Sequence, residues 1–241
     1  MTTATGGKVR VEACAKRVRA YLGGDLVVDT MRPLLVWEVR YYPTYYVPAE
    51  DVRARLEPTD DSDVYDVVTE HATAARAARR FPNSPNPELR EAVRLEWSAM
   101  TEWLEEDEPV YTHARDPYTR VDVLASSRHV RVELDGVVLA ESRSPRILFE
   151  TGLPPRYYLP LSDLRVDLLR PSSRQTHCPY KGTAGYWSVE VNGVVHPDLV
   201  WIYRTPLPES QKIAGLACFY NERVDLVVDG VAVERPRTPF S

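Results

Sequence analysis

Cysteine is scarce in this sequence, and so are the long apolar runs of membrane proteins. The chain has three cysteines, too few and too far apart for the disulfide framework of a small secreted domain. No apolar run approaches the ~18 residues that cross a bilayer, and residues 1–10 contain no apolar core of a signal peptide. We therefore expect a cytoplasmic protein with no membrane partner.

Familiar catalytic and ligand-binding motifs are missing as well. The five histidines have no metal-ligand spacing, and the chain has no Cys-x-x-Cys pair to hold zinc. It has no G-x-x-x-x-G-K-S/T phosphate loop, no G-x-G-x-x-G fingerprint and no G-x-S-x-G elbow. We predict neither a metal site nor a bound cofactor.

Positive charge is not concentrated anywhere along the chain. The 241 residues carry a net charge of −5, and acidic residues usually stand beside the dispersed arginines. No strongly basic face is implied, so nucleic acid is not the expected partner. Arginine is abundant while lysine is limited to Lys8, Lys16, Lys181 and Lys212, a bias typical of a bacterial genome rich in G and C.

What the sequence does contain is an internal repeat. Residues 18–53 align without a gap with residues 130–165, a shift of 112 residues. Identical pairs include Val18/Val130, Glu38/Glu150, Tyr46/Tyr158, Asp51/Asp163 and Arg53/Arg165. A repeat of this period indicates two related domains. Features in both copies are typical of scaffold, so we interpret the shared acids and arginines as salt bridges or turn contacts.

The second copy has the pattern of an all-β domain. Residues 130–134 alternate apolar and polar side chains, and Asp135-Gly136 is a hairpin turn signal. Further strands continue to residue 228, with a turn at Asn192-Gly193 and a short helix or turn at residues 208–213. We therefore predict a mainly β fold.

The first copy departs from this pattern after its first strands. Residues 69–80 are rich in alanine and arginine, which favours a helix. Asn86 then fits an N-cap and Pro87 the first position of a second helix, whose apolar stripe runs from Leu89 to Leu104. The first copy is thus expected to carry a helical insert at about residues 64–105.

The domain boundary is predicted from the last strand of each copy. Residues 120–122 repeat the Arg-Val-Asp sequence of residues 223–225, which we interpret as the closing strand of both domains. The predicted domains are therefore residues 1–125, the diverged first repeat, and residues 126–241, the second repeat.

Chemistry-bearing residues gather in the second copy alone. The segment His177-Cys178-Pro179-Tyr180-Lys181-Gly182 leads into Tyr186-Trp187, and more aromatic residues follow downstream. The pattern T-x-C-P-Y-K-G-x-A-x-Y-W, then W-x-Y-x-x-P, then I-x-G-x-x-x-F-Y, resembles the domain of unknown function 427 family. That family has also been labelled a nucleotidyltransferase, a label for which the residues give no independent support.

The resemblance covers residues 130–230, and residues 18–124 look like a diverged first copy. It implies two tandem domains similar to the β-tent folds, in which two antiparallel sheets meet at an angle over a pocket. The residues that match the family pattern, and that we take as candidate ligand-binding residues, are Tyr180, Lys181, Gly182, Tyr186, Trp187, Trp201, Tyr203, Phe219 and Tyr220, with Cys178 and His177 as candidate catalytic residues.

Three functions remain open at this point. In the first, the second domain binds a small flat or anionic molecule among aromatic side chains, with Lys181 as polar anchor. In the second, the protein is an enzyme in which Cys178 is the nucleophile and His177 or Lys181 activates it. In the third, the helical insert binds a protein partner. The sequence does not set the oligomeric state.

Overall fold

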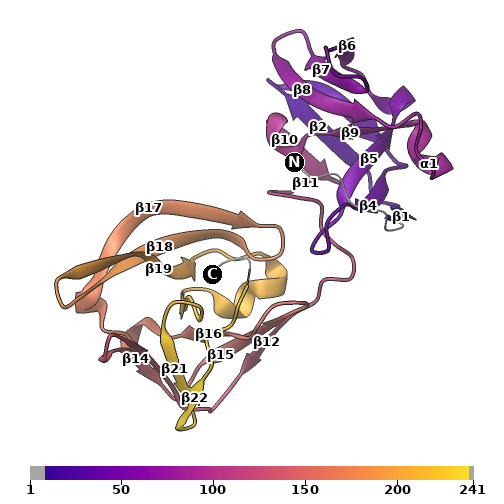
Figure 1. Cartoon of the computed structure of the whole chain (residues 1–241). Coiled ribbons are helices and arrows are strands. Elements are labelled where there is room, and N and C mark those ends of the chain that lie inside the picture. The colour runs from indigo at the N-terminus through magenta and orange to yellow at the C-terminus, as the bar shows by residue number, and fades with distance from the viewer. Residues whose placement is uncertain (1–8, 239–241) are drawn as a thin grey trace. The chain divides into compact units, whose positions relative to one another are not determined.

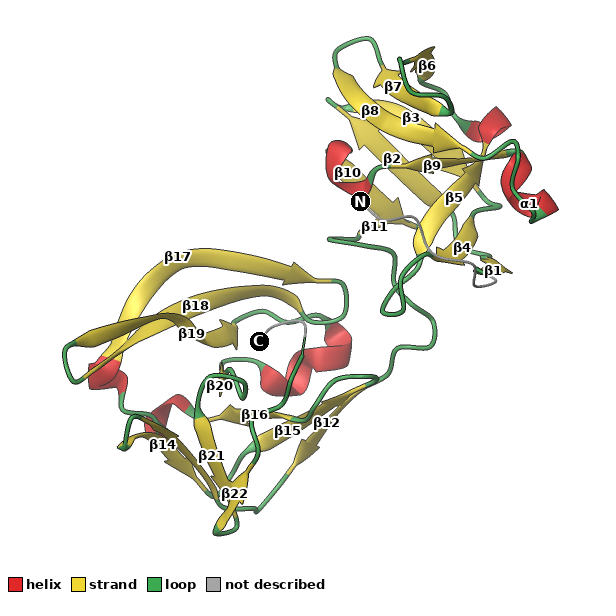
Figure 2. Cartoon of the chain, in the orientation of Figure 1, coloured by secondary structure: helices red, strands yellow, loops and turns green. Residues whose placement is uncertain are grey.

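The computed structural model describes residues 9–238 and divides the chain into two compact units, residues 1–116 and 117–241 (Figure 1). Each unit contains one seven-stranded and one four-stranded antiparallel sheet (Figure 2). The prediction of two tandem, mainly β domains is confirmed. No helix within the described residues combines the length and apolarity needed to cross a membrane.

In the second unit, the seven-stranded sheet has the strand order β12-β15-β16-β20-β19-β18-β17, and the four-stranded sheet has the order β14-β13-β21-β22. The strands are β12 (Val121–Ala125), β13 (Val130–Leu134), β14 (Val137–Ser142), β15 (Arg146–Glu150), β16 (Arg156–Leu159), β17 (Leu169–Cys178), β18 (Gly182–Val191), β19 (Val194–Tyr203), β20 (Ala217–Phe219), β21 (Asp225–Val228) and β22 (Val231–Val233). The short 3-10 helices are η3 (Leu161–Asp163), η4 (Val166–Leu168) and η5 (Pro208–Ile213).

The first unit repeats this topology strand for strand. Its sheets have the orders β1-β4-β5-β9-β8-β7-β6 and β11-β10-β2-β3. The elements are β1 (Arg10–Ala13), β2 (Val18–Leu22), β3 (Asp25–Thr30), β4 (Leu34–Trp37), β5 (Thr44–Pro48), η1 (Ala49–Asp51), β6 (Arg55–Pro58), β7 (Val64–Val68), β8 (Thr73–Arg80), α1 (Pro87–Arg90), β9 (Ala92–Leu95), η2 (Trp97–Ala99), β10 (Glu102–Glu105) and β11 (Glu108–Pro109).

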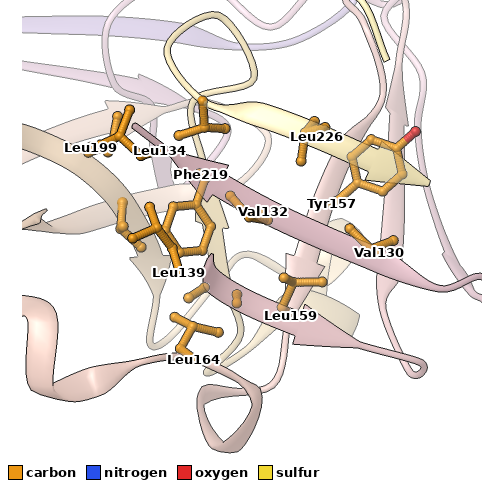
Figure 3. Close-up of a cluster of buried hydrophobic side chains, with 14 of the residues drawn as sticks. Val130, Val132, Leu134, Leu139, Tyr157, Leu159, Leu164, Leu199, Phe219 and Leu226 are labelled. Carbon is orange, nitrogen blue, oxygen red and sulfur yellow. The ribbon is translucent and has the colours of Figure 1, made fainter. Parts of the chain in front are cut away.

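The main core of the second unit lies between its two sheets (Figure 3). Val130, Val132 and Leu134 alternate along β13 and point into it, while the polar residues between them point outward. The turn after β13 has positive φ at Asp135 (49°) and Gly136 (77°), as the primed hairpin turn predicted from the sequence requires. The alternation and the turn together fix the register of this hairpin.

The predicted helices of the first unit are largely wrong. Residues 73–80 form β8, paired with β7 on one side and β9 on the other. Within the region from 64 to 105, the helices are the four-residue α1 and the 3-10 turn η2, and the other elements are the strands β7 to β10 with the loops between them. Asn86 does cap α1, because its side chain accepts a hydrogen bond from the Glu88 amide at 3.0 Å, and Pro87 is the first residue. The sheet pairing of residues 73–80 overrides their intrinsic helix propensity.

The predicted boundary is also displaced. Residues 121–125 form β12, which pairs with β15 and so opens the second unit instead of closing the first. The counterpart of β12 is β1, and the counterpart of β21 is β10, so the resemblance between residues 120–122 and 223–225 does not reflect equivalent strands.

Candidate functional site

The C-P-Y-K-G motif forms the turn of the long β17–β18 hairpin. Cys178 and Gly182 are paired across the hairpin, and Gly182 has a φ of 92°, which favours glycine. The turn is tied to the η5 segment, because the Leu207 amide donates to the Lys181 carbonyl at 3.2 Å and the Ser210 hydroxyl donates to the Tyr180 carbonyl at 3.2 Å. The motif thus holds Lys181 in one defined position.

Lys181 points into the unit and forms an ion pair. Its Nζ atom lies 2.6 Å from Oε2 of Glu150, the last residue of β15, and the two side chains are 11% and 10% exposed. Burial alone would lower the pKa of Lys181, but the neighbouring Cys178 and Glu150 outweigh burial and raise it. The ammonium group therefore stays charged in a largely dry setting.

An aromatic face lies on the side of the seven-stranded sheet opposite the inter-sheet core. We use this name for Tyr158, Tyr186, Trp201, Tyr203 and Tyr220, which pack in one cluster with the buried Cys218. Trp201 Nε1 donates to the Tyr158 hydroxyl at 3.0 Å, and the Trp201 and Tyr220 rings meet edge to face at 4.6 Å. Trp201 is 7% exposed and Tyr203 5%, so these rings pack tightly, whereas Tyr220 is only partly buried.

The Lys181–Glu150 pair and the aromatic face are neighbours. Tyr203 interacts electrostatically with Glu150, Cys178 and Tyr186, which together with burial raise its pKa well above the usual value, burial being the larger cause. Tyr203 therefore links the buried ion pair and Cys178 to the aromatic cluster.

The rim of the face carries polar groups. The Tyr186 hydroxyl lies 2.8 Å from the Thr176 hydroxyl and 3.5 Å from that of Tyr220. Arg156 lies with its guanidinium 5.6 Å from the centre of the Trp201 ring. It donates to both carboxylate oxygens of Glu222 at 2.7 Å.

The structure brings together some of the predicted site residues and separates others. Lys181, Tyr186, Trp201, Tyr203 and Tyr220 share the aromatic face or border it. The side chains of Trp187 and Phe219 instead pack in the core between the sheets, because neighbouring residues on a strand point to opposite faces. Tyr180 and Gly182 build the turn.

Cys178 lies beside Lys181, and the ring of His177 contacts Thr183. Cys178 is partly exposed at the end of β17 and is one of the groups that raise the Lys181 pKa. His177 Nδ1 lies 2.9 Å from the Thr183 hydroxyl, across the hairpin. Lys181 is thus a direct neighbour of the Cys178 side chain.

Sequence reasoning missed Arg156 and Glu222, and it quoted Thr176 in the motif without naming it as a candidate site residue. It had assigned Glu38 and Glu150 to salt bridges, and this is confirmed by the pairs Arg94–Glu38 at 3.0 Å and Lys181–Glu150 at 2.6 Å. Glu150 and Tyr158 are identical to Glu38 and Tyr46 in the first copy. This identity was the available sign that Glu150 and Tyr158 belong to the site, but we interpreted it as a feature of the scaffold.

The first unit has the same strand order as the second, but different side chains occupy the positions of the aromatic face. By strand register, Arg94 stands where the second unit has Cys218, since each pairs with the repeated tyrosine, Tyr46 or Tyr158. Arg79 likewise stands in the place of Trp201. At these two positions the corresponding face therefore carries arginines paired with acids, where the second unit has a cysteine and a tryptophan.

The packing of that face in the first unit is also different. Leu89 of α1 and Phe81 pack against Tyr46, whose hydroxyl donates to Glu38 at 2.7 Å. Burial is the main reason that the pKa of Tyr46 is raised. The repeated tyrosine and glutamate thus contact each other directly in the first unit, whereas in the second unit Glu150 is bonded to Lys181 and Tyr158 to Trp201.

Within residues 9–238, no group of three or more His, Cys, Asp or Glu side chains is arranged to hold a metal ion. A comparison with curated proteins finds no match to the chain. A comparison with protein families finds one match, described as a domain of unknown function (DUF427), over residues 10–94 and again over residues 122–230. These two segments coincide with the two units, and the chain therefore belongs to the DUF427 family as a two-copy member.

Proposed function

We propose that the second unit binds a small flat molecule at the aromatic face, and that Lys181 donates a hydrogen bond to it. The observation that carries the proposal is the buried Lys181–Glu150 pair next to Tyr203 and Cys178. An ammonium group has three donors, and one of them is engaged by the carboxylate of Glu150. In the proposed complex, another donor orients the ligand.

The charge of the pair narrows the ligand class. Glu150 neutralises Lys181, and a second carboxylate brought to the same ammonium would be repelled by Glu150 in a setting of low dielectric constant. An uncharged acceptor such as an amide carbonyl meets no such repulsion. The aromatic face, which Tyr203 connects to the pair, would give stacking and edge contacts to a planar ring that reaches it. A flat, neutral, carbonyl-bearing molecule therefore fits better than an anion.

A thermal-shift measurement with matched compounds tests the proposal. Nicotinamide and nicotinate, or benzamide and benzoate, have the same ring but differ in the charge of the substituent. We expect the amides to raise the Tm of the full chain and the carboxylates to raise it less. Equal or stronger stabilisation by the carboxylates would contradict the ligand class.

Lysine variants provide the control. Lys181→Met should abolish the shift caused by the amide, whereas Lys212→Met should keep it, because Lys212 is exposed and its ammonium donates to the Val123 carbonyl. Persistence of the shift in Lys181→Met would place the binding site elsewhere.

A second function, an enzyme with Cys178 as nucleophile, is favoured by one observation. The thiol lies beside the buried ammonium group of Lys181, which would stabilise negative charge that develops on the sulfur when it attacks an electrophile. Labelling with iodoacetamide at neutral pH should then modify Cys178 faster than Cys14, which is also partly exposed, and Lys181→Met should slow the modification. Equal rates for Cys178 and Cys14 would remove the basis for this function.

The third function, binding of a protein partner by a helical insert, depended on helices that the structure largely lacks at the predicted positions. Residues 64–105 were expected to form a separate helical surface, but they supply strands to both sheets of the first unit. No separate insert is left to bind a partner.

A further inference from the structure

The segment that follows β22, residues 234–238, turns back to the part of the second unit that carries the aromatic face. The Thr238 hydroxyl donates to Oε1 of Glu222 at 2.5 Å, although sixteen residues separate the two in sequence. At its start, the segment is held to β21 by Arg235, whose Nη2 atom lies 2.7 Å from Asp225 Oδ1. Pro236 and Thr238 are partly buried, while Arg235 and Arg237 are exposed. Alternate residues therefore face the unit.

The carboxylate that Thr238 contacts is the one that positions Arg156. Glu222 and Arg156 have side chains 1% and 7% exposed, and the Arg156 guanidinium lies over the Trp201 ring. Burial alone would raise the pKa of Glu222, but the hydrogen bonds from Arg156 and Thr238 outweigh it and lower the pKa. A continuous series of contacts thus links Thr238, through Glu222 and Arg156, to the centre of the aromatic face.

We propose that residues 234–238 act as a strap that covers the Arg156 end of the aromatic face and limits access to Trp201. The proposal rests on the proposed function in that the covered surface is the candidate ligand site. Release of Thr238 removes a donor from Glu222 and opens the buried Arg156–Glu222 pair to water. Arg156 is then free to move away from the Trp201 ring, and the edge of that ring becomes accessible.

The chain offers matched variants for a test. Thr238→Val removes the hydroxyl at nearly constant volume, whereas Thr238→Ser keeps it. Arg237→Ala serves as a control, because it changes the exposed residue next to Thr238 and keeps the Thr238 hydroxyl. Deletion of residues 236–241 removes the part of the strap that contacts Glu222, and it keeps the Arg235–Asp225 contact at the start of the strap.

Access to Trp201 is measured without any ligand. The full chain is labelled with 5-fluorotryptophan, whose five fluorine resonances correspond to the five tryptophans, and the variants Trp201→Phe and Trp187→Phe assign two of them. A soluble nitroxide then broadens each resonance according to its accessibility. We expect several-fold greater broadening of the Trp201 resonance in Thr238→Val and in the deletion. Thr238→Ser and Arg237→Ala should match the unmodified chain, and so should the Trp187 resonance in all variants.

Unchanged broadening of the Trp201 resonance in the deletion would overturn the strap. Broadening of all five resonances would show general loosening of the fold and would also overturn it. Because this readout needs no ligand, it is independent of the binding proposal. If nicotinamide stabilises none of the variants while Trp201 becomes accessible in the deletion, the strap stands and the proposed ligand class fails.

Discussion

Lys181 Nζ and Glu150 Oε2 lie 2.6 Å apart, and nearly nine-tenths of each side chain is hidden from solvent. In the first unit the equivalent carboxylate, Glu38, pairs with Arg94 of β9. The same acid is thus kept in both units and receives its cation from different parts of the sheet. A buried carboxylate without a cationic partner would lower the stability of the unit. The first prediction follows from this.

Lys181→Met should lower the free energy of unfolding of the second unit by about 3–5 kcal/mol, because it leaves the Glu150 carboxylate buried without a partner. The double variant Lys181→Met/Glu150→Gln should recover most of this loss. Urea unfolding followed by tryptophan fluorescence measures both.

The matched control is Arg32→Met. Arg32 pairs with Glu50, but these side chains are 63% and 71% exposed, so the loss should be much smaller than in Lys181→Met. Similar losses in Lys181→Met and Arg32→Met would show that the buried pair contributes no more than a surface pair.

Tyr158→Phe tests the hydrogen bond at the centre of the aromatic face. The Trp201 indole N–H would lose its acceptor in a buried setting, at a cost of about 1–3 kcal/mol. Trp201→Phe removes the donor, so the double variant should cost less than the sum of the single variants. Strict additivity in this double-mutant cycle would contradict a direct contribution from the bond.

Alkaline pH should destabilise the second unit, because several of its buried groups have raised pKa values. Burial is the main cause that raises the pKa of Cys218 to about 12 and raises those of Tyr158 and Tyr203 well above their usual values. A raised pKa means that stability is full below the unfolded-state pKa and falls as pH rises toward the folded-state value. For Cys218 this window runs from about 9 to about 12.

Each group that ionises only in the unfolded state should lower the free energy of unfolding by about 1.4 kcal/mol per pH unit within its window. Urea midpoints at pH 8, 9, 10 and 11 give the slope. Cys218→Ala should have a lower midpoint at pH 8 but a shallower decline above pH 9. An unchanged decline would mean that the thiol does not contribute.

The position of the domain boundary can be checked with two fragments. Residues 117–241 contain β12, which pairs with β15 and contributes the buried Val123. Residues 126–241 lack it, and Lys212 then loses the Val123 carbonyl to which its ammonium donates. We expect the longer fragment to fold cooperatively with protected amide hydrogens in β15, and the shorter one to lose that protection. Equal protection would show that β12 is dispensable.

The sequence was sufficient to predict the parts of the fold that depend on local pattern. The alternation in residues 130–134, the Asp-Gly turn and the cap formed by Asn86 all act over a few residues, and each is found in the structure. The tandem architecture was predictable because the gap-free repeat at residues 18–53 and 130–165 covers corresponding strands of the two units.

Parts that depend on distant pairing were not predicted. Residues 73–80 favour a helix locally, but they lie between β7 and β9, and that pairing outweighs propensity. Their counterpart is β19, which the sequence did predict as a strand. The gap-free match between the copies ends before these strands, so the second copy could not correct the first.

The candidate site was predictable only by residue type. The motif identified Lys181, Tyr186, Trp201 and Tyr203, which the structure places together. It could not identify Glu222 or Arg156 as neighbours of Trp201, because they approach from the region after β20 and from β16 and contact each other only in three dimensions.

The replacement of Trp201 by Arg79 at the equivalent register position has a practical consequence. One polypeptide contains both a version of the scaffold with a ring at this position and a version with a charged side chain there, under identical solvent, temperature and concentration. Any compound that acts on the Trp201 ring therefore has a reference unit without that ring in every molecule of the sample. Spectra from the N-terminal half serve as the baseline against which changes in the C-terminal half are recorded.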